Sequence, residues 1–232
     1  QGIIDFSVPS GGISGKAIHL RAINDISDLS VYGLGVANNG GGSDGQEYTF
    51  PSISVLAGDD ILVARDLSAM SSYFSSCYTE FDHVLQANTG ISQNGDDAIE
   101  LFLNGSVFET FGDINIDGTG EPWEYLDSWA YKTNPGTIGS FSIADWSFGG
   151  INCTDGSTTI FDASCTYPIC LNSNSIVSID SIVITNPILC YGDLANFEVF
   201  VDNDTSSIPG TSNFVPYQLK AFKVGSFSTF SY

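Results

Sequence analysis

Residues 98–112 read AIELFLNGSVFETFG, and this stretch decides the fold class. Short runs rich in apolar and aromatic residues flank Asn104-Gly105, which is typical of two strands around a tight turn. Asn-Gly supplies the two positive-φ residues that a type I′ hairpin requires. The stretch therefore predicts two antiparallel strands, Ala98–Leu103 and Ser106–Gly112.

The same residue pattern continues on both sides of this hairpin, with short strand-like runs separated by clusters of Gly, Asn, Asp and Ser. Regular spacing of this kind is typical of a sandwich or barrel. One short helix is expected at Asp66–Phe74, lying on the surface. Further strands are expected at Ala17–Ala22, Tyr32–Ala37, Gln46–Phe50, Asp60–Ala64, Ser128–Tyr131 and Trp146–Gly149.

The pattern of apolar and polar residues changes after Cys170, where a short polar connector precedes a new set of strand-like runs. We therefore expect a first domain over residues 1–171 and a second over residues 172–232. The second domain is small and ends without a closing turn, so an incomplete β domain is predicted. Its expected strands are Val177–Ile184, Asn196–Val201 and Pro216–Val224.

The charge balance limits the partners of this chain. Asp and Glu outnumber Lys and Arg by 27 to 6, which gives a formal net charge of −21. Such a surface repels nucleic acids and anionic membranes, because contacts to phosphate need Lys or Arg. No apolar run reaches the roughly 18 residues of a membrane helix, so membrane insertion is not expected.

Five cysteines indicate the compartment: Cys77, Cys153, Cys165, Cys170 and Cys190. They form no CxxC pair and only two histidines accompany them, which disfavours a zinc site. We expect disulfides Cys153–Cys165 and Cys77–Cys170, with Cys190 unpaired, although other pairings and buried free thiols stay open. Disulfides belong to oxidising compartments. The start at Gln1 fits an exported chain that has lost its signal peptide, although a fragment of a longer chain would begin the same way.

The motif with the most specific spacing is DINIDGTGEPWE at residues 113–124. Oxygen-bearing side chains fall at positions one, three, five, nine and twelve, with a glycine at position six. This is the spacing of a calcium loop. The alternative is an acidic connection between strands whose carboxylates face water. The expected ligands of a structural Ca²⁺ are Asp113, Asn115, Asp117, Glu121 and Glu124.

Nothing in the sequence favours catalysis. His19 is expected on a strand surface and His83 in a loop, and a Cys77/His83 pair would be oxidised in an exported protein. The acid pairs Asp59-Asp60 and Asp96-Asp97 start strands, where capping of turns is expected of them. An aromatic surface for sugar binding is an alternative to a core role for five side chains: Trp123, Tyr125, Trp129, Tyr131 and Trp146.

Three segments carry a resemblance to a known family: KAIHLRAINDISDLSVYGLGVANNGG from residue 16, EYTFPSISVLAGDDILVA from residue 47, and residues 94–132. Together they resemble the lamin-tail domain in its exported Bacteroidetes version. The resemblance implies an immunoglobulin-like β-sandwich. His19 and Arg21 depart from the family pattern, which commonly has Glu and Tyr at these places.

Residues 182–223 are similar to the repeats of SprB-type gliding adhesins. The similarity rests on Cys190, Gly192, Pro216 and Tyr217. It implies a long surface protein that is exported through the type IX secretion system and serves gliding motility.

The sequence thus predicts a non-catalytic, extracellular or cell-surface protein that acts in adhesion, display or surface assembly. Its expected partners are a protein or glycan on a surface, or further copies of the same repeat. Two alternatives remain, namely an accessory domain of an exported nuclease or phosphatase and a carbohydrate-binding module.

Overall fold

The computed structural model describes residues 1–8, 13–171, 178–186, 196–202, 221–222 and 229–230. The chain divides into two compact units, Gln1–Ser175 and Ile176–Tyr232. The first unit is mostly β, with two sheets and one short helix. The expected all-β, sandwich-like class is confirmed at this level.

The larger sheet of the first unit has six strands in the order β10-β9-β1-β2-β5-β6. Neighbouring strands run antiparallel except β5 and β6, which pair in parallel. The strands are β10 (Trp146–Phe148), β9 (Ser128–Lys132), β1 (Gly2–Asp5), β2 (Lys16–Arg21), β5 (Asp60–Ala64) and β6 (His83–Gln86).

The smaller sheet contains the predicted hairpin. Its order is β4 (Tyr48–Thr49), β3 (Tyr32–Ala37), β7 (Ala98–Leu103) and β8 (Ser106–Phe111). Asn104 and Gly105 have φ values of 51° and 75°, and Leu103 pairs with Ser106 across the turn. The two-residue turn predicted from Asn-Gly is therefore confirmed.

The two sheets enclose one apolar core. Alternate residues of β1, β2 and β5 point toward the smaller sheet, and β3, β7 and β8 contribute the facing side chains. The largest contributors include Ile3, Ile18, Ile61, Leu34, Phe111, Trp123 and Tyr125. The aromatic rings of this core meet mostly edge to face around Phe111.

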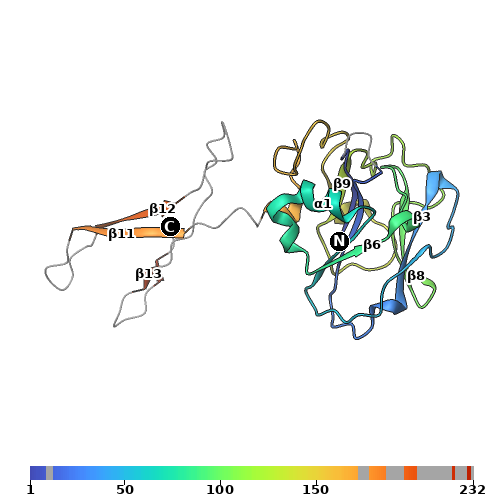
Figure 1. Ribbon diagram of the computed structural model, residues 1–232, viewed down its shortest axis with the longest axis horizontal. Helices are drawn as coiled ribbons and strands as arrows, with labels where there is room; N and C mark the ends of the chain where they lie inside the picture. The colour runs from blue at the N-terminus through green and yellow to red at the C-terminus, as the bar shows by residue number, and fades with distance from the viewer. Residues whose placement is uncertain (9–12, 172–177, 187–195, 203–220, 223–228, 231–232) are drawn as a thin grey trace. The chain divides into compact units, whose positions relative to one another are not determined.

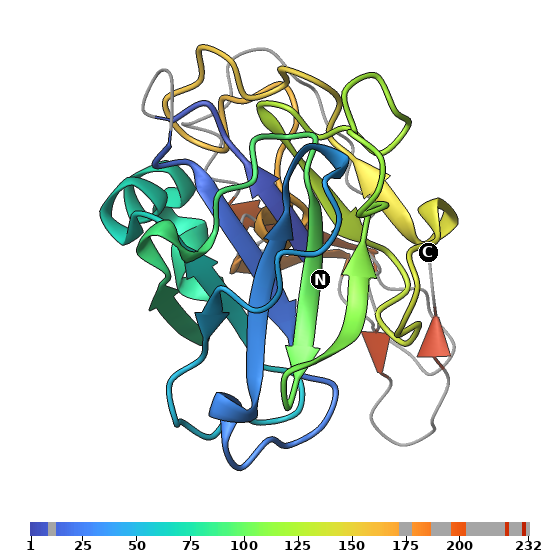
Figure 2. The same cartoon turned by 90° about the vertical axis from the view of Figure 1, so that its right-hand side faces the viewer.

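A second apolar cluster covers the outer face of the six-stranded sheet. Helix α1 (Leu67–Phe74) begins after Asp66, whose Oδ1 accepts a hydrogen bond from the Ala69 amide at 3.0 Å. It packs against Ile4, Leu62 and Trp129 together with the segment that contains Ile160 and Tyr167. Figure 1 shows α1, the larger sheet (β6, β9) and the smaller sheet (β3, β8) as successive layers, and Figure 2 shows the smaller sheet from its outer side.

Several elements differ from the prediction. Strands β1 and β6 were not predicted, because GIID and HVLQ are too short to show a period of two. The expected Gln46–Phe50 strand is only two residues long. The helix was predicted correctly, but its Met70, Tyr73 and Phe74 are buried rather than on the surface. Short 3-10 helices occupy Leu29–Val31, Asn38–Gly40, Ser75–Glu80, Asn88–Gly90, Ile143–Asp145 and Pro168–Leu171.

The second unit contains two strand pairs within its described residues. Strands β11 (Ser178–Asn186) and β12 (Asn196–Asp202) pair antiparallel, as do β13 (Ala221–Phe222) and β14 (Thr229–Phe230). The first two correspond to expected strands. Cys190, Gly192 and residues 216–217, which carry the adhesin-repeat resemblance, lie outside the described residues.

Candidate functional site

The predicted calcium loop follows β8 and uses its acidic side chains as turn caps. Oδ1 of Asp113 accepts from the Asn115 amide at 2.9 Å, and Oδ1 of Asp117 accepts from the Thr119 amide at 3.0 Å. Oε2 of Glu124 accepts from the Gly120 amide at 2.7 Å. The hydrogen bonds from Thr119 lower the pKa of Asp117, because they favour its charged form.

The same loop docks on the turn before β7. The Gly118 amide donates to the Asp96 carbonyl at 2.9 Å, and the Thr119 hydroxyl donates to the Asp96 carboxylate at 2.8 Å. A Cβ on Gly118 would lie 2.5 Å from the Asp96 carbonyl oxygen and 2.6 Å from the Trp123 ring. Glycine is therefore required here by close packing, whereas the calcium-loop pattern requires it for a tight turn.

Within the described part of the chain, no group of three or more His, Cys, Asp or Glu side chains gathers in a geometry for a metal ion. The five expected ligands share one loop, and three of the four carboxylates already accept backbone hydrogen bonds. Calcium binding at this loop stays a prediction.

Two disulfides brace the segments that cover the outer face of the six-stranded sheet, and they join the pairs expected from the sequence. Cys77–Cys170 connects the 3-10 helix after α1 to the 3-10 helix Pro168–Leu171, and both cysteines are buried. Cys153–Cys165 closes a short loop next to β9. Cys190 lies outside the described residues.

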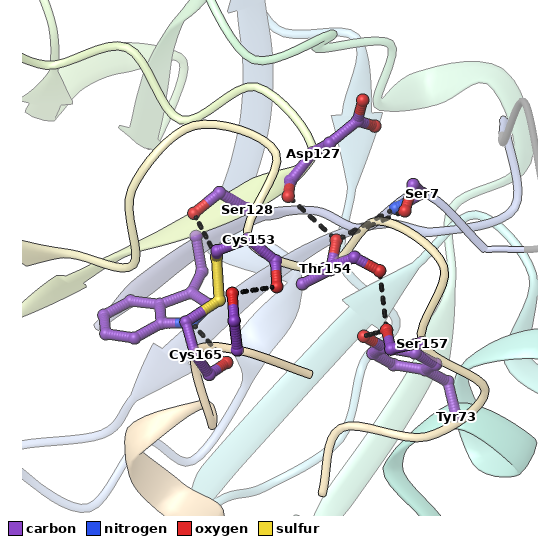
Figure 3. The surroundings of a disulfide bond; sticks show 10 residues. Ser7, Tyr73, Asp127, Ser128, Cys153, Thr154, Ser157 and Cys165 are labelled. Carbon is purple, nitrogen blue, oxygen red and sulfur yellow. Dashed lines mark hydrogen bonds between the residues drawn. A yellow bond between two sulfur atoms is a disulfide. The ribbon is translucent and has the colours of Figure 1, made fainter. Parts of the chain in front are cut away.

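Hydrogen bonds around Cys153–Cys165 anchor this loop to three distant segments (Figure 3). The Thr154 hydroxyl donates to the Asp127 carbonyl at 2.8 Å and lies 3.3 Å from the Ser7 amide, which donates to it. The Ser157 hydroxyl lies 2.6 Å from that of Tyr73 on α1. The loop is thus a fixed part of the fold rather than a loose insertion.

His19 is completely buried, which corrects the expectation of a strand-surface histidine. Its Nε2 lies 2.9 Å from Oδ1 of Asp60, and its Nδ1 lies 2.9 Å from the Tyr167 hydroxyl. Since a carboxylate only accepts, Nε2 carries the proton and Nδ1 accepts from Tyr167. Burial lowers the pKa of His19 to about 4, so the neutral ring is the form that the core contains.

The His19 side chain is packed among aromatic rings. Its ring contacts Phe81, Tyr131 and Tyr167. The second histidine, His83, begins β6 instead of lying in a loop, and its Nε2 lies 3.0 Å from Oδ2 of Asp59. The Cys77/His83 pair does not exist, because Cys77 is in a disulfide.

The acid pairs act mainly as turn caps, as expected. Asp59 accepts from the Leu56 amide at 2.8 Å, and Asp97 accepts from the Asn39 and Asn94 amides. Asp60 differs, because its carboxylate contacts His19 and Arg21 on the neighbouring strand.

The aromatic side chains take the core role, and the alternative of an aromatic surface does not form. Trp123, Tyr125 and Trp129 are buried, and Tyr131 and Trp146 are half-buried. Trp123, Tyr125 and Trp146 belong to the core between the sheets, whereas Trp129 and Tyr131 belong to the outer cluster. The carbohydrate-binding alternative thereby loses the residues on which it depended.

A cavity that sequence reasoning missed is the best candidate for a binding site. It has a volume of about 190 Å³, and its walls come from β2, β3, β5, β7, β8, the end of β9 and the segments after β2 and β9. Apolar side chains dominate these walls. Its lining includes Arg21, Ile23, Tyr32, Phe108, Lys132 and Ile138. An apolar hollow with a few polar groups is the usual form of a small-ligand site.

The charged groups at this cavity are already paired. Nη1 of Arg21 donates to Asp60 at 3.0 Å, and Nζ of Lys132 donates to Glu109 and to the Thr137 carbonyl. Ile23 and Ile138 line the cavity while remaining 48% and 45% exposed, so the rim is apolar. The cavity thus favours an apolar group over an ion.

The described fold is that of a disulfide-braced, sandwich-like β protein with one helical flank. Comparison of the chain with models of protein families, with curated proteins and with solved structures gave no match. No helix among the described residues is long and apolar enough to cross a membrane.

Proposed function

We propose that this chain is a non-catalytic module of an exported surface protein, acting in adhesion, display or surface assembly. The observation that carries the proposal is the pair of disulfides, Cys77–Cys170 and Cys153–Cys165, which cross-link the segments on the outer face of the six-stranded sheet. Stable structural disulfides persist in extracellular compartments and are rare in the cytosol. The resemblance to exported lamin-tail domains and to SprB-type adhesin repeats supports the same setting.

The arrangement of basic groups argues against an anionic partner. Four of the six Lys and Arg residues are described, and each one has an internal acceptor. The pairs are Lys16–Asp5, Arg21–Asp60, Lys132–Glu109 and Arg65 with the Ile91 carbonyl. With a net charge of −21, such a surface gives phosphate groups little to bind. A protein or an uncharged glycan is the favoured partner, and the cavity with its apolar rim is the favoured contact.

Exposure at the surface can be tested on intact cells that produce the protein. Proteinase K added outside the cells should degrade the chain while a cytosolic marker stays intact. Survival of the chain until the cells are lysed would contradict the proposal.

The contact itself can be tested with arrays of glycans and of surface proteins. Ile138→Ser at the cavity rim should weaken any binding that the wild type shows. Ile151→Ser is a matched control, because Ile151 is 51% exposed but does not line the cavity. Equal binding by both variants would exclude the cavity as the contact.

A further inference from the structure

Two oppositely charged side chains meet inside the sandwich at the ends of its two central strands. Asp5 of β1 and Lys16 of β2 are directly opposite in the antiparallel register. Only 4% of Asp5 and 8% of Lys16 is exposed. Nζ of Lys16 lies 3.2 Å from Oδ1 of Asp5, so an amine and a carboxyl group are in contact away from water.

Hydrogen-bond partners surround this pair, and two further carboxyl groups, those of Asp97 and Asp127, interact electrostatically with Lys16. Nζ of Lys16 also donates to the Gln93 carbonyl. Gln93 is fully buried, and its side-chain amide donates to the Ile4 and Ala17 carbonyls at 3.2 Å. The Asp127 backbone amide donates to the Asp5 carboxyl. The Lys16 amine and the Asp5 carboxyl group are thus each held by more than one hydrogen-bond partner.

Burial also changes the acidity of the carboxyl group. Desolvation raises the pKa of Asp5 to about 6, because the ionised form loses its water. Because the pKa of Asp5 is raised, transfer of one proton from the Lys16 ammonium to the Asp5 carboxylate costs less than it would in water. This single transfer yields the neutral acid beside a neutral amine. Burial of an ion pair costs desolvation energy, and a neutral product avoids this cost.

We propose that Lys16 and Asp5 condense to an intramolecular isopeptide bond between β1 and β2. Nζ of the neutral lysine attacks Cγ of the protonated Asp5, a C–N bond forms, and one C–O bond breaks. The leaving hydroxyl takes up the proton that nitrogen loses and departs as water. No oxidant, cofactor or second substrate is needed.

The neighbouring groups fit the course of this reaction. The Asp127 backbone amide stabilises the oxygen of the tetrahedral intermediate, since it already donates to the same carboxyl group. The Asp127 side chain interacts electrostatically with Lys16 and Asp5, and its pKa is raised by burial, so it suits transfer of the proton from nitrogen to the leaving oxygen. After reaction the new amide N–H keeps the Gln93 carbonyl as its acceptor.

Because the strand register holds Lys16 opposite Asp5, the effective concentration of the amine at the carboxyl group is high. The bond would fasten the end of β1, which lies between β9 and β2 in the centre of the sheet. It does not depend on the proposed surface function, although it would strengthen a module that bears mechanical load.

The test is the intact mass of the purified full chain, measured without reduction. The mass should be lower than that of the chain with two disulfides by the mass of one water molecule. A peptide map should contain one branched peptide that joins the segments around Asp5 and Lys16, with no tryptic cleavage after Lys16. The map is essential, because a cyclic imide at Asp117-Gly118 would also lose one water but would give no branched peptide.

Variants make the assignment specific. Asp5→Ala and Lys16→Arg should each keep the full mass, whereas Lys132→Arg, at the other buried lysine–acid pair, should keep the loss of water. Asp127→Asn should slow the loss of water in freshly refolded protein. If Asp5→Ala fails to fold, the wild-type map alone decides. A wild-type chain that retains full mass after long incubation near pH 6, and is cleaved after Lys16 once unfolded, would overturn the proposal.

Discussion

The hydroxyl of Tyr167 lies 2.9 Å from Nδ1 of His19, although 148 residues separate them along the chain. This contact joins the disulfide-braced segment near the end of the first unit to a central strand of the six-stranded sheet. Cys77–Cys170 and Cys153–Cys165 hold the segment in place around it. The outer cluster is therefore part of the fold, and its removal should destabilise the six-stranded sheet.

The His19 contact makes stability depend on pH. Burial lowers the pKa of His19 to about 4, whereas the unfolded chain has a value near 6.5. Between these values the unfolded state binds more protons, so this contribution is complete above pH 6.5 and is lost as pH falls toward 4. The loss should approach about 3 kcal/mol, from about 1.4 kcal/mol for each pKa unit.

Urea unfolding at pH 7 and pH 5 of wild type and His19→Gln would isolate this effect. The difference in the free energy of unfolding between the two proteins should be smaller at pH 5 than at pH 7, because Gln does not titrate. In any molecules in which Asp5 is not linked to Lys16, Asp5 contributes with the opposite sign, since its pKa is raised to about 6. This contribution is common to both proteins and cancels in the difference. A difference that is equal at both pH values would mean that His19 is not the buried neutral ring.

The two disulfides should differ in their contribution to stability. Cys77–Cys170 spans 93 residues and Cys153–Cys165 spans 12. From the loop entropy of the unfolded chain, we expect these disulfides to stabilise the fold by about 4.6 and about 3 kcal/mol respectively. Denaturant unfolding of the two double variants, Cys77→Ala/Cys170→Ala and Cys153→Ala/Cys165→Ala, would measure this. A larger loss for the shorter loop would show that native contacts, rather than chain entropy, dominate.

Close packing at Gly118 leads to a prediction about the acidic loop. Gly118→Ala should lower the free energy of unfolding by about 1–3 kcal/mol, since the new Cβ would meet the Asp96 carbonyl and the Trp123 ring. Gly136→Ala is the control, because its nearest neighbour would be 3.9 Å away. Thermal unfolding of both variants gives the comparison, and equal melting temperatures would contradict the docked loop.

Calcium binding by the same loop is tested by melting the chain in EGTA and in millimolar calcium. Binding to the folded state alone should add about 2.7 kcal/mol at a hundredfold excess over Kd. Asp117→Asn keeps an oxygen that can accept from the Thr119 amide but removes a charge, so it should reduce the rise without removing the turn cap. Curves that coincide in EGTA and calcium would end the calcium hypothesis.

Local signals in the sequence predicted much of the fold. Asn104-Gly105 fixes its hairpin through two positive φ values, and three cysteines within residues 153–170 favour a short disulfide-closed loop without fixing the pairing. Strand β1 gave no such signal, because both its faces are covered and it has only four residues. The burial of His19 depends on Tyr167 and Phe81, which are remote in sequence.

The candidate binding site was not predictable for the same reason. Its walls come from segments between the start of the chain and Ile138, and none of them carries a ligand-binding motif. The calcium-loop spacing, in contrast, is visible in the sequence. In the fold, its side chains Asp113 and Asp117 cap turns instead of converging.

The central claim is that this is a disulfide-braced module of a protein outside the cytosol. The most direct test is to alkylate thiols in intact producing cells, denature the protein, and map its cysteines by mass spectrometry. The account predicts that Cys77–Cys170 and Cys153–Cys165 resist alkylation and appear as linked peptides. Alkylation of all four cysteines before any reductant is added would contradict it.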